Sequence, residues 1–349
     1  MKQKILKIII ISILIILTGV IIVLLIEKSK NNIEVPEHNN EVMTEKVNEV
    51  KQPEIFSGND RPIAVMIDNV GAARPQVGLN DAFIVYEIIV EGNQTRLMAV
   101  FKNKKVNKIG PIRSSRHYFL DYALENDAIY THFGWSPQAK SDISKLSVKN
   151  INGIYESSKS FWRVKDKPAP HNVITSTEKI LEIAQRKGYS TKSNKKSVLK
   201  YSVDEIELES GNTANNIIIP YSSSYKVTYK YDDEKKVYVR GYNKTTQKDW
   251  QTKEMITTKN IIITFAKNTT IDDGSGKGRQ NLQNIGKMEG YYITNGKAIK
   301  IECYKSSRKE QTVYRDLEGN EINVNDGNTF IQIVPTDKKV TIEEWIEIS

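Results

Sequence analysis

Residues 61–67 read RPIAVMI and are followed at once by an aspartate and an asparagine. A continuous apolar run that ends at turn-forming residues predicts a strand buried on both faces. Residues 82–90 (AFIVYEIIV) predict a second strand and 95–101 (TRLMAVF) a third, with the hairpin signal Gly92-Asn93 between them. The folded part of the chain is therefore predicted to open with a sheet that starts near residue 61.

Helical signals alternate with strands in the next hundred residues. Residues 128–133 predict another strand, and Ser136 and Pro137 have the positions of the cap and the first residue of a helix. The predicted helices are 114–124, 137–146 and a third that follows the capping-box pattern at 175–178. Strands interleaved with helices predict an α/β domain over residues 56–190.

The pattern changes after a Ser/Lys-rich connection at residues 191–200. Residues 201–349 contain short strands separated by turn signals such as Asn295-Gly296 and Asp326-Gly327. They predict a mostly antiparallel β domain. The predicted fold class is α+β, with the α/β domain followed by the β-rich one.

The amino-terminal segment is apolar. Residues 8–26 carry no charge and as a helix would span roughly 28 Å, about one bilayer core. Lys2, Lys4 and Lys7 precede this run, so an uncleaved signal anchor is expected, with residues 1–7 cytoplasmic and the bulk of the chain extracytoplasmic. The alternative is a cleaved signal peptide, although the run ends without an A-x-A-like site. Residues 27–55, polar and acidic, are expected to form a flexible linker.

Composition narrows the range of functions. The single cysteine, Cys303, excludes a disulfide framework and lipid attachment at a cysteine after the apolar run.

The net charge is +9, and residues 55–190 hold 19 Lys and Arg against 13 Asp and Glu. Such a domain would be attracted to anionic lipid heads or wall polymers. A generally basic, solvated surface explains the same counts. Nucleic acid is not an expected partner, because the basic residues form no dense run.

Three polar clusters are the candidate ligand-binding segments. Residues 110–117 (GPIRSSRH) place two arginines and two hydroxyls where a loop is predicted to enter a helix, an arrangement that suits carboxylate or phosphate. Residues 132–138 (HFGWSPQ) follow a strand, where α/β sheets bind ligands. Residues 168–172 (PAPHN) form a proline-bracketed loop that could point His171 into a site. Helix capping, turn formation and packing are the alternative roles of the same residues.

Acidic residues at strand ends complete the candidate set. Paired carboxylates would suit glycosidase chemistry, but acids at such positions are also ordinary turn formers. No His-x-x-x-His pair occurs, so neither a metal nor a cofactor is expected. The predicted ligand-binding residues are Asp68, Asn69, Glu87, Arg113, Ser114, Ser115, Arg116, His132, Ser136, Gln138, Arg163, His171 and Asn172.

Several of these stretches together resemble the DUF3048 family of YerB-like lipoproteins of Gram-positive bacteria. The similar segments are 61–69, 74–76, 86–96, 110–116, 136–139 and 170–172. The resemblance implies a protein attached outside the membrane, whose activity is poorly defined in the family. The chain departs from the family by its long apolar run, which replaces a lipid-modified cysteine.

The sequence thus predicts a membrane-anchored binding protein of the cell envelope. Its ligand would be an anionic or polar wall polymer fragment, or a wall-synthesis protein. A wall-active hydrolase with His132 or His171 as base is one alternative, and a pure protein scaffold is another.

Overall fold

The computed structural model describes residues 18–22 and 53–343. Residues 18–22 are helical. The predicted cytoplasmic tip and almost all of the predicted anchor (8–26) and linker (27–55) lie outside the described residues. Within the part of the chain that the structure describes, none of the helices combines the length and the apolarity needed to cross a bilayer. The chain from Lys51 onward forms one compact unit, which is treated by itself below.

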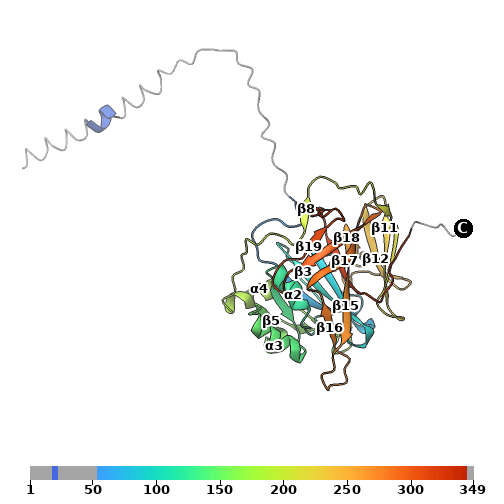
Figure 1. Cartoon of the computed structure of the whole chain (residues 1–349). Coiled ribbons are helices and arrows are strands. Elements are labelled where there is room, and N and C mark those ends of the chain that lie inside the picture. Colours follow the sequence, from blue (N-terminus) through green and yellow to red (C-terminus); the bar gives the residue numbers. More distant parts are fainter. Residues whose placement is uncertain (1–17, 23–52, 344–349) are drawn as a thin grey trace, which may run out of the picture. The chain divides into compact units, whose positions relative to one another are not determined.

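A mixed sheet runs through the middle of this unit and takes strands from both halves of the chain (Figure 1). In sheet order its strands are β19 (Val313–Arg315), β18 (Lys297–Lys305), β17 (Gly286–Thr294), β15 (Asn260–Thr270), β21 (Thr329–Pro335), β2 (Ile84–Ile89), β3 (Thr95–Phe101), β1 (Ile63–Asp68), β4 (Ile129–His132) and β5 (Asn150–Asn152). Two further strands pair at its side, β16 (Gln280–Gln283) with β15 and β9 (Asn212–Thr213) with β18.

The strand β21 joins the two halves of this sheet. It comes from the end of the chain, yet it lies parallel to β15 on one side and to β2 on the other. All seven of its residues are buried, as expected for a strand covered on both faces. The predicted α+β fold class, with an α/β domain followed by a separate antiparallel β domain, is therefore wrong: the described chain is mostly β, and its central sheet is shared by both halves.

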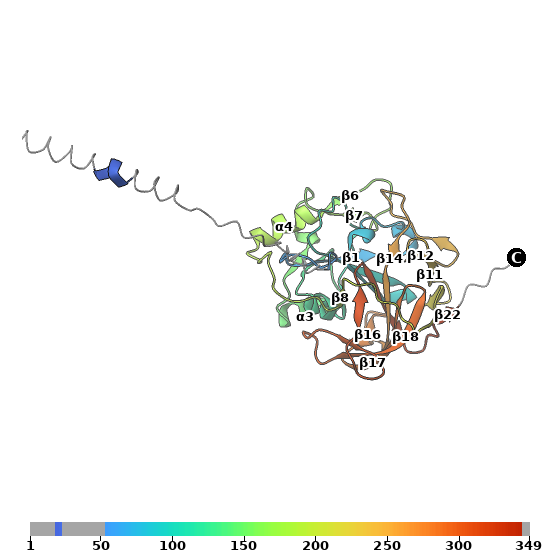
Figure 2. The same cartoon turned by 90° about the horizontal axis from the view of Figure 1, so that it is seen from above.

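A smaller sheet covers part of one face of the central sheet (Figure 2). Its strands in order are β13 (Thr245–Thr246), β12 (Val237–Tyr242), β11 (Lys226–Asp232), β10 (Asn216–Pro220) and β22 (Thr341–Glu343), with β14 (Thr257–Thr258) beside β12. Ile219 and Val227 of the smaller sheet share a hydrophobic core with Val85 of β2. Two short pairs complete the strands, β20 (Asn323–Asn325) with β8 (Lys200–Ser202) and β6 (Trp162–Arg163) with β7 (Val173–Ile174).

The helices lie on both faces of the central sheet and gather at one end of the unit (Figure 1). They are α2 (Phe119–Glu125), α3 (Pro137–Lys145) and α4 (Thr177–Arg186). Helix α4 packs into the core that the smaller sheet also closes, whereas α2 and α3 pack into the core on the opposite face. The first strand, β1, feeds both cores, because Val65 points to one and Met66 to the other. This double burial explains the unbroken apolar run at 61–67.

The helix predicted after the capping-box pattern at 175–178 is confirmed as α4, although its cap lies one residue after the first residue of that pattern. Ser176 is the N-cap, and its hydroxyl accepts a hydrogen bond from Lys179 N at 3.2 Å. We expect Ser176→Ala to lower the free energy of unfolding by about 1 kcal/mol, because one amide of the first turn loses its acceptor. Urea denaturation measures this change. Ser176→Asp keeps an acceptor and should stay near the wild-type value; equal losses in both variants would contradict the capping role.

Candidate functional site

A polar pocket of about 470 Å³ opens where β1 ends, where β3 begins and where the loops before α2 and α3 meet. Its lining includes five cationic side chains and two carboxylates. These charged residues are Asp68, Glu91, Arg96, Arg113, Arg116, Lys277 and Arg279. We call this site the arginine pocket. It draws on both halves of the chain, since Lys277 and Arg279 come from the hairpin between β15 and β16.

The loop that carries Arg113 and Arg116 is fixed by its own backbone. Arg113 N donates to Met66 O at 2.9 Å, and Arg113 O accepts from Phe133 N at 3.0 Å, so the loop bridges the ends of β1 and β4. The helix predicted at 114–124 begins only at Phe119, and its cap, Tyr118, makes no side-chain hydrogen bond. That prediction is wrong at its start. The positive charge of the pocket therefore comes from side chains and not from a helix end.

Asp68 organises one wall of the arginine pocket. Its side chain is 1% exposed, and Oδ2 accepts from His171 Nδ1 at 2.7 Å and pairs with Arg113 Nε at 3.2 Å. A carboxylate that is shared in this way holds both donors in place. It brings His171, on the proline-bracketed loop, next to the pocket and leaves the rest of the Arg113 guanidinium for another partner.

Glu91 organises a second group of arginines in the pocket. Its Oε1 lies 2.5 Å from Arg116 Nε and 4.0 Å from Arg279 Nε. Burial raises the pKa of Glu91, but the hydrogen bond and charge of Arg116 outweigh it, and the pKa is lowered overall. Glu91 is therefore ionised at neutral pH. Arg279 also pairs with Asp273, at the edge of the pocket.

Arg96, in β3, is buried, unlike the other cationic residues that line the pocket. It is 8% exposed, and Nη1 donates to the carbonyl oxygen of Ser114 at 2.6 Å. Burial, with the nearby charge of Arg116, lowers the pKa of Arg96 to about 10. The side chain stays cationic at neutral pH, although its charge is only partly balanced. A buried cation in this position favours an anionic partner.

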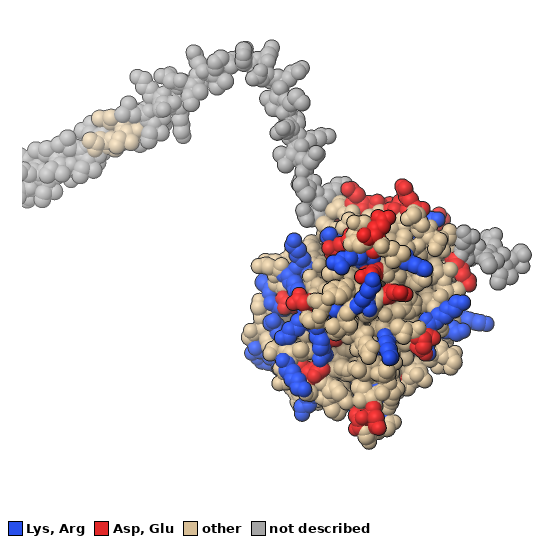
Figure 3. All heavy atoms as spheres, viewed as in Figure 1, with Lys and Arg blue, Asp and Glu red and all other residues tan. Residues whose placement is uncertain are grey.

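The surface outside the pocket differs from it. Figure 3 shows Lys and Arg spread over one face of the unit, with Asp and Glu among them. Exposed charges of both signs screen one another and are further screened by salt. The arginine pocket differs because Arg96 is buried and the other three arginines of its lining are partly buried, and a charge acts more strongly away from water.

Four other predicted site residues, from the segments 110–117 and 132–138, make hydrogen bonds within the protein. Ser114 lines the pocket and its hydroxyl donates to Phe133 O at 3.0 Å, while Ser115 is buried and accepts from the Tyr130 hydroxyl at 2.8 Å. Ser136 lines the pocket and is the N-cap of α3, as predicted, accepting from Ala139 N. Gln138 points to Asp273, with its amide nitrogen 3.2 Å from Oδ2.

His132 lies away from the pocket, in the core. It is 0% exposed, and its Nδ1 lies 2.7 Å from Gly134 O, which requires a proton on Nδ1. Its ring packs between Tyr130 and Trp135. Burial lowers the pKa of His132 to about 4. The ring is therefore neutral and closed off, which does not suit the base of a hydrolase.

The low pKa of His132 predicts a pH-dependent loss of stability. The unfolded chain takes up a proton near pH 6.5, but the folded chain does so only near pH 4, so stability falls as pH falls through this interval. This difference in the pKa of His132 between the unfolded and folded chain corresponds to about 3 kcal/mol of the free energy of unfolding. We expect the difference in free energy of unfolding between wild type and His132→Gln to shrink by that amount from pH 7 to pH 4.

The comparison with His132→Gln isolates this histidine. Burial raises the pKa of Asp121 to about 6, an effect that Arg308 partly offsets. Asp121 therefore has the opposite effect on stability from His132: its contribution is present at low pH and is lost as pH rises through about 6. Asp121 titrates in both proteins, so its contribution cancels in the difference. Urea denaturation at the two pH values measures the change. Parallel pH profiles in the two proteins would show that His132 does not titrate as described.

Arg163 and Asn172 support the loop of His171. Arg163 is exposed on the β6–β7 pair, and its Nη1 donates to the side-chain oxygen of Asn172 at 2.6 Å. Neither residue lines the arginine pocket. Their contact fixes the two ends of the segment that presents His171 to Asp68.

Glu87 and Asn69 belong to a buried network between the two sheets. Glu87 Oε2 accepts from Arg240 Nη2 of β12 at 2.6 Å, and both side chains are 0% exposed. Asn69 and Thr95 both donate to the other carboxylate oxygen of Glu87, and the Tyr225 hydroxyl does so at 3.0 Å. The network joins the smaller sheet to the central one. Glu87 and Asn69 are both buried in it, and neither lines the arginine pocket.

Sequence reasoning did not select several residues of the pocket. Arg96 lies inside a strand pattern, where the run at 95–101 indicates only packing, and Arg279 follows a Gly/Ser-rich turn more than 160 residues after Arg116. Glu91 follows the predicted strand at 82–90, where an acid is also an ordinary turn former. The one available signal was an arginine in a buried strand, because a buried charge requires a partner.

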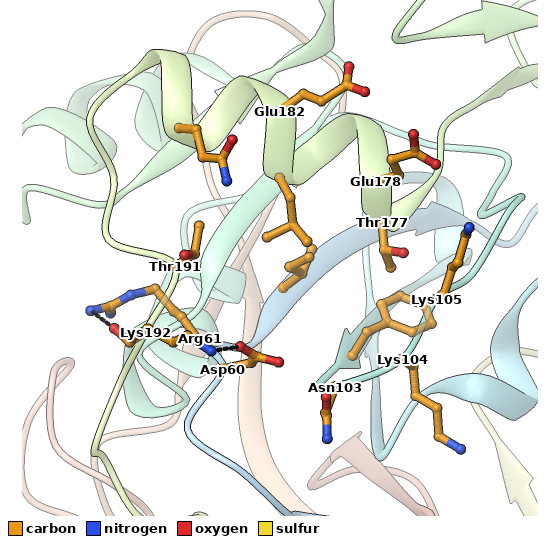
Figure 4. Close-up of a pocket in the computed structure, with 14 residues that line it drawn as sticks. Asp60, Arg61, Asn103, Lys104, Lys105, Thr177, Glu178, Glu182, Thr191 and Lys192 are labelled. Carbon is orange, nitrogen blue, oxygen red and sulfur yellow. Dashed lines mark hydrogen bonds and ion pairs between the residues drawn. The ribbon is translucent and has the colours of Figure 1, made fainter.

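A larger hollow, of about 770 Å³, lies elsewhere, beside α4 (Figure 4). Asp60 pairs there with Lys192 at 2.5 Å, and Arg61 donates to the carbonyl oxygens of Ser190 and Lys192. Figure 4 shows Glu178 and Glu182 extending from α4, away from Asp60 and Arg61. The hollow beside α4 is lined by charges of both signs, some of which pair with one another. It therefore has less preference for one kind of ligand than the arginine pocket has.

Both halves of the chain are similar to known proteins. Residues 49–190 match the family model "Protein of unknown function (DUF3048) N-terminal domain", and 217–331 match the DUF3048 C-terminal domain. The chain is 31% identical over 286 residues to "Putative lipoprotein YerB" of Bacillus subtilis (strain 168), covering 79% of this chain and 81% of that protein. The crystal structure of the YerB protein from Bacillus subtilis is similar with a TM-score of 0.73 and 29% identity, over 83% of this chain and 96% of that one. The chain therefore belongs to the DUF3048 family.

Proposed function

We propose that the protein binds an anionic ligand of the cell envelope in the arginine pocket. The observation that carries this proposal is the excess of positive charge: five cationic side chains, of which Arg96 is buried and Lys277 is exposed, line one hollow with two carboxylates. Arginine forks match phosphate and carboxylate groups, and the hollow has the size of a small-molecule site. Wall polymer fragments that carry phosphate or carboxylate are the ligands we propose.

The ion pairs in the walls support this function, because they orient the arginines in advance. Asp68 holds Arg113 and Glu91 holds Arg116, so each guanidinium loses little freedom when a ligand arrives. Arg96, below them, contributes charge that its hydrogen bond to Ser114 does not balance. An entering anion would compensate this charge.

The location at the outer side of the membrane is part of the proposal. It rests on the Bacillus subtilis relative, whose name describes a lipoprotein. Lipoproteins are held at a membrane surface by lipid chains. An extracytoplasmic, membrane-associated protein would meet wall polymers directly.

The test is thermal unfolding of the full chain with inorganic phosphate, glycerol phosphate and muropeptides, each against sodium chloride at equal ionic strength. A ligand at 100 times its dissociation constant stabilises the folded state by about 2.7 kcal/mol. We expect at least one anion to raise the melting temperature above the chloride control. If no anion raises it, the arginine pocket is not a ligand site, and a wall-synthesis protein becomes the partner to search for.

A further inference from the structure

An exposed apolar surface adjoins the arginine pocket. It consists of Trp135, Ile154 and Tyr155, which we call the aromatic shelf. Tyr155 is 73% exposed and Ile154 is 53% exposed, both on the short 3-10 helix at Gly153–Tyr155. The Trp135 ring lies 5.9 Å from that of Tyr155, and Trp135 also lines the pocket. Large apolar side chains that gather in the open beside a charged hollow indicate a binding surface.

The pocket and the shelf meet at Gly134. A Cβ atom there would lie 3.0 Å from Ser114 Oγ, in the pocket wall, and 3.3 Å from Ile154 Cδ1, on the shelf. Only glycine allows this approach at its φ of +86°. One ligand of modest size can therefore touch both surfaces at once.

The shelf is held rigidly. The side-chain oxygen of Asn152 accepts hydrogen bonds from Gly134 N at 2.9 Å and from Ile154 N at 3.2 Å. These bonds join the loop of Trp135 to the loop of Tyr155. The aromatic surface is thus formed before any ligand arrives, which lowers the entropic cost of binding.

The two surfaces together select one chemical class. The face of an aromatic ring packs well against the C–H groups of a sugar ring, and cationic forks bind phosphate or carboxylate. A neutral sugar would leave the arginines unused, and a simple anion would leave the shelf unused. We propose that the site binds an anionic sugar, with its ring on Tyr155 and Trp135 and its phosphate or carboxylate in the pocket. This inference rests on the proposed function of the pocket and names its ligand.

Calorimetric titration of the full chain tests the inference. The ligands are inorganic phosphate, N-acetylglucosamine 1-phosphate, glucuronic acid and neutral N-acetylglucosamine. The variant is Tyr155→Ala, and the control is Leu317→Ala, which removes an apolar side chain of equal exposure (73%) in a turn outside the pocket lining. Both positions are exposed, so both variants should fold, which their melting curves will verify.

We expect the sugar phosphate to bind about tenfold more tightly than phosphate, and Tyr155→Ala to remove that gain without changing phosphate affinity. Leu317→Ala should keep it. If phosphate binds but the sugar phosphate binds no better, or if Tyr155→Ala keeps the gain, the sugar inference is overturned and the anion site stands. If none of the anions binds, the proposed function fails with it.

Discussion

Arg240→Met is expected to lower the free energy of unfolding by about 3–5 kcal/mol, the usual cost of removing one member of a buried ion pair. Arg240 and Glu87 are both fully buried, with Nη2 and Oε2 2.6 Å apart. Burial lowers the pKa of Arg240, but the charge of Glu87 raises it well above its ordinary value, so the guanidinium is ionised. The variant leaves the Glu87 carboxylate buried without its cation.

The double variant Glu87→Gln/Arg240→Met separates the pair from packing. It removes both charges, so it should be more stable than Arg240→Met alone, and the difference gives the cost of leaving the Glu87 carboxylate buried without its cation. Lys200→Ala is the control, since Lys200 pairs with Glu321 at 3.3 Å and both side chains are exposed, at 53% and 44%. It should change the free energy of unfolding by less than about 1 kcal/mol. Urea denaturation measures all three; a loss in Arg240→Met no larger than in the control would refute the role of the network.

The second large effect concerns the pocket. Arg113→Ala and Arg116→Ala should each weaken phosphate binding by about 10- to 100-fold, because a hydrogen bond to a charged group contributes about 1.5–3 kcal/mol. Each change also frees a carboxylate, Asp68 or Glu91, that would then repel the anion. Calorimetric titration with phosphate measures the affinity of each variant.

Arg186→Ala serves as the control for phosphate binding. It removes the same charge from the chain but lies on α4, outside the pocket lining. Its phosphate affinity should match that of the wild type. Equal weakening in Arg186→Ala and Arg113→Ala would mean that phosphate responds to net charge and not to the pocket.

Local sequence patterns predicted the single elements well. The strand at 95–101 has the predicted bounds, and α4 begins within one residue of the position that the capping-box pattern predicts. Such elements depend on neighbouring residues: alternating burial in a strand, or a hydroxyl three residues before an amide that needs an acceptor. Interactions of this range can be found in a single sequence.

The arrangement of the elements could not be predicted in this way. The strand at 329–335 was expected in a separate domain, but it pairs with β2, about 245 residues earlier in the chain. Nothing in its local pattern identifies its neighbour, because strand pairing is decided by tertiary packing. The fold class was mistaken for this reason.

The candidate site was predicted only in part, because it too depends on tertiary packing. Asp68, Arg113 and Arg116 line the pocket, because they lie at the ends of elements that local patterns reveal. Glu87 and His132 also follow or lie within predicted strands, but they are buried and face the core. Whether a strand residue faces the core or a pocket depends on which elements cover it, and that is a property of the whole fold.

The most direct test of the arginine pocket is a crystal structure of the protein soaked with N-acetylglucosamine 1-phosphate. If the arginine pocket binds the anion, we expect phosphate density in contact with the Arg113 and Arg116 guanidinium groups. Density for the ligand only elsewhere, such as the hollow beside α4, or none in the pocket at a concentration that saturates binding in solution, would contradict it.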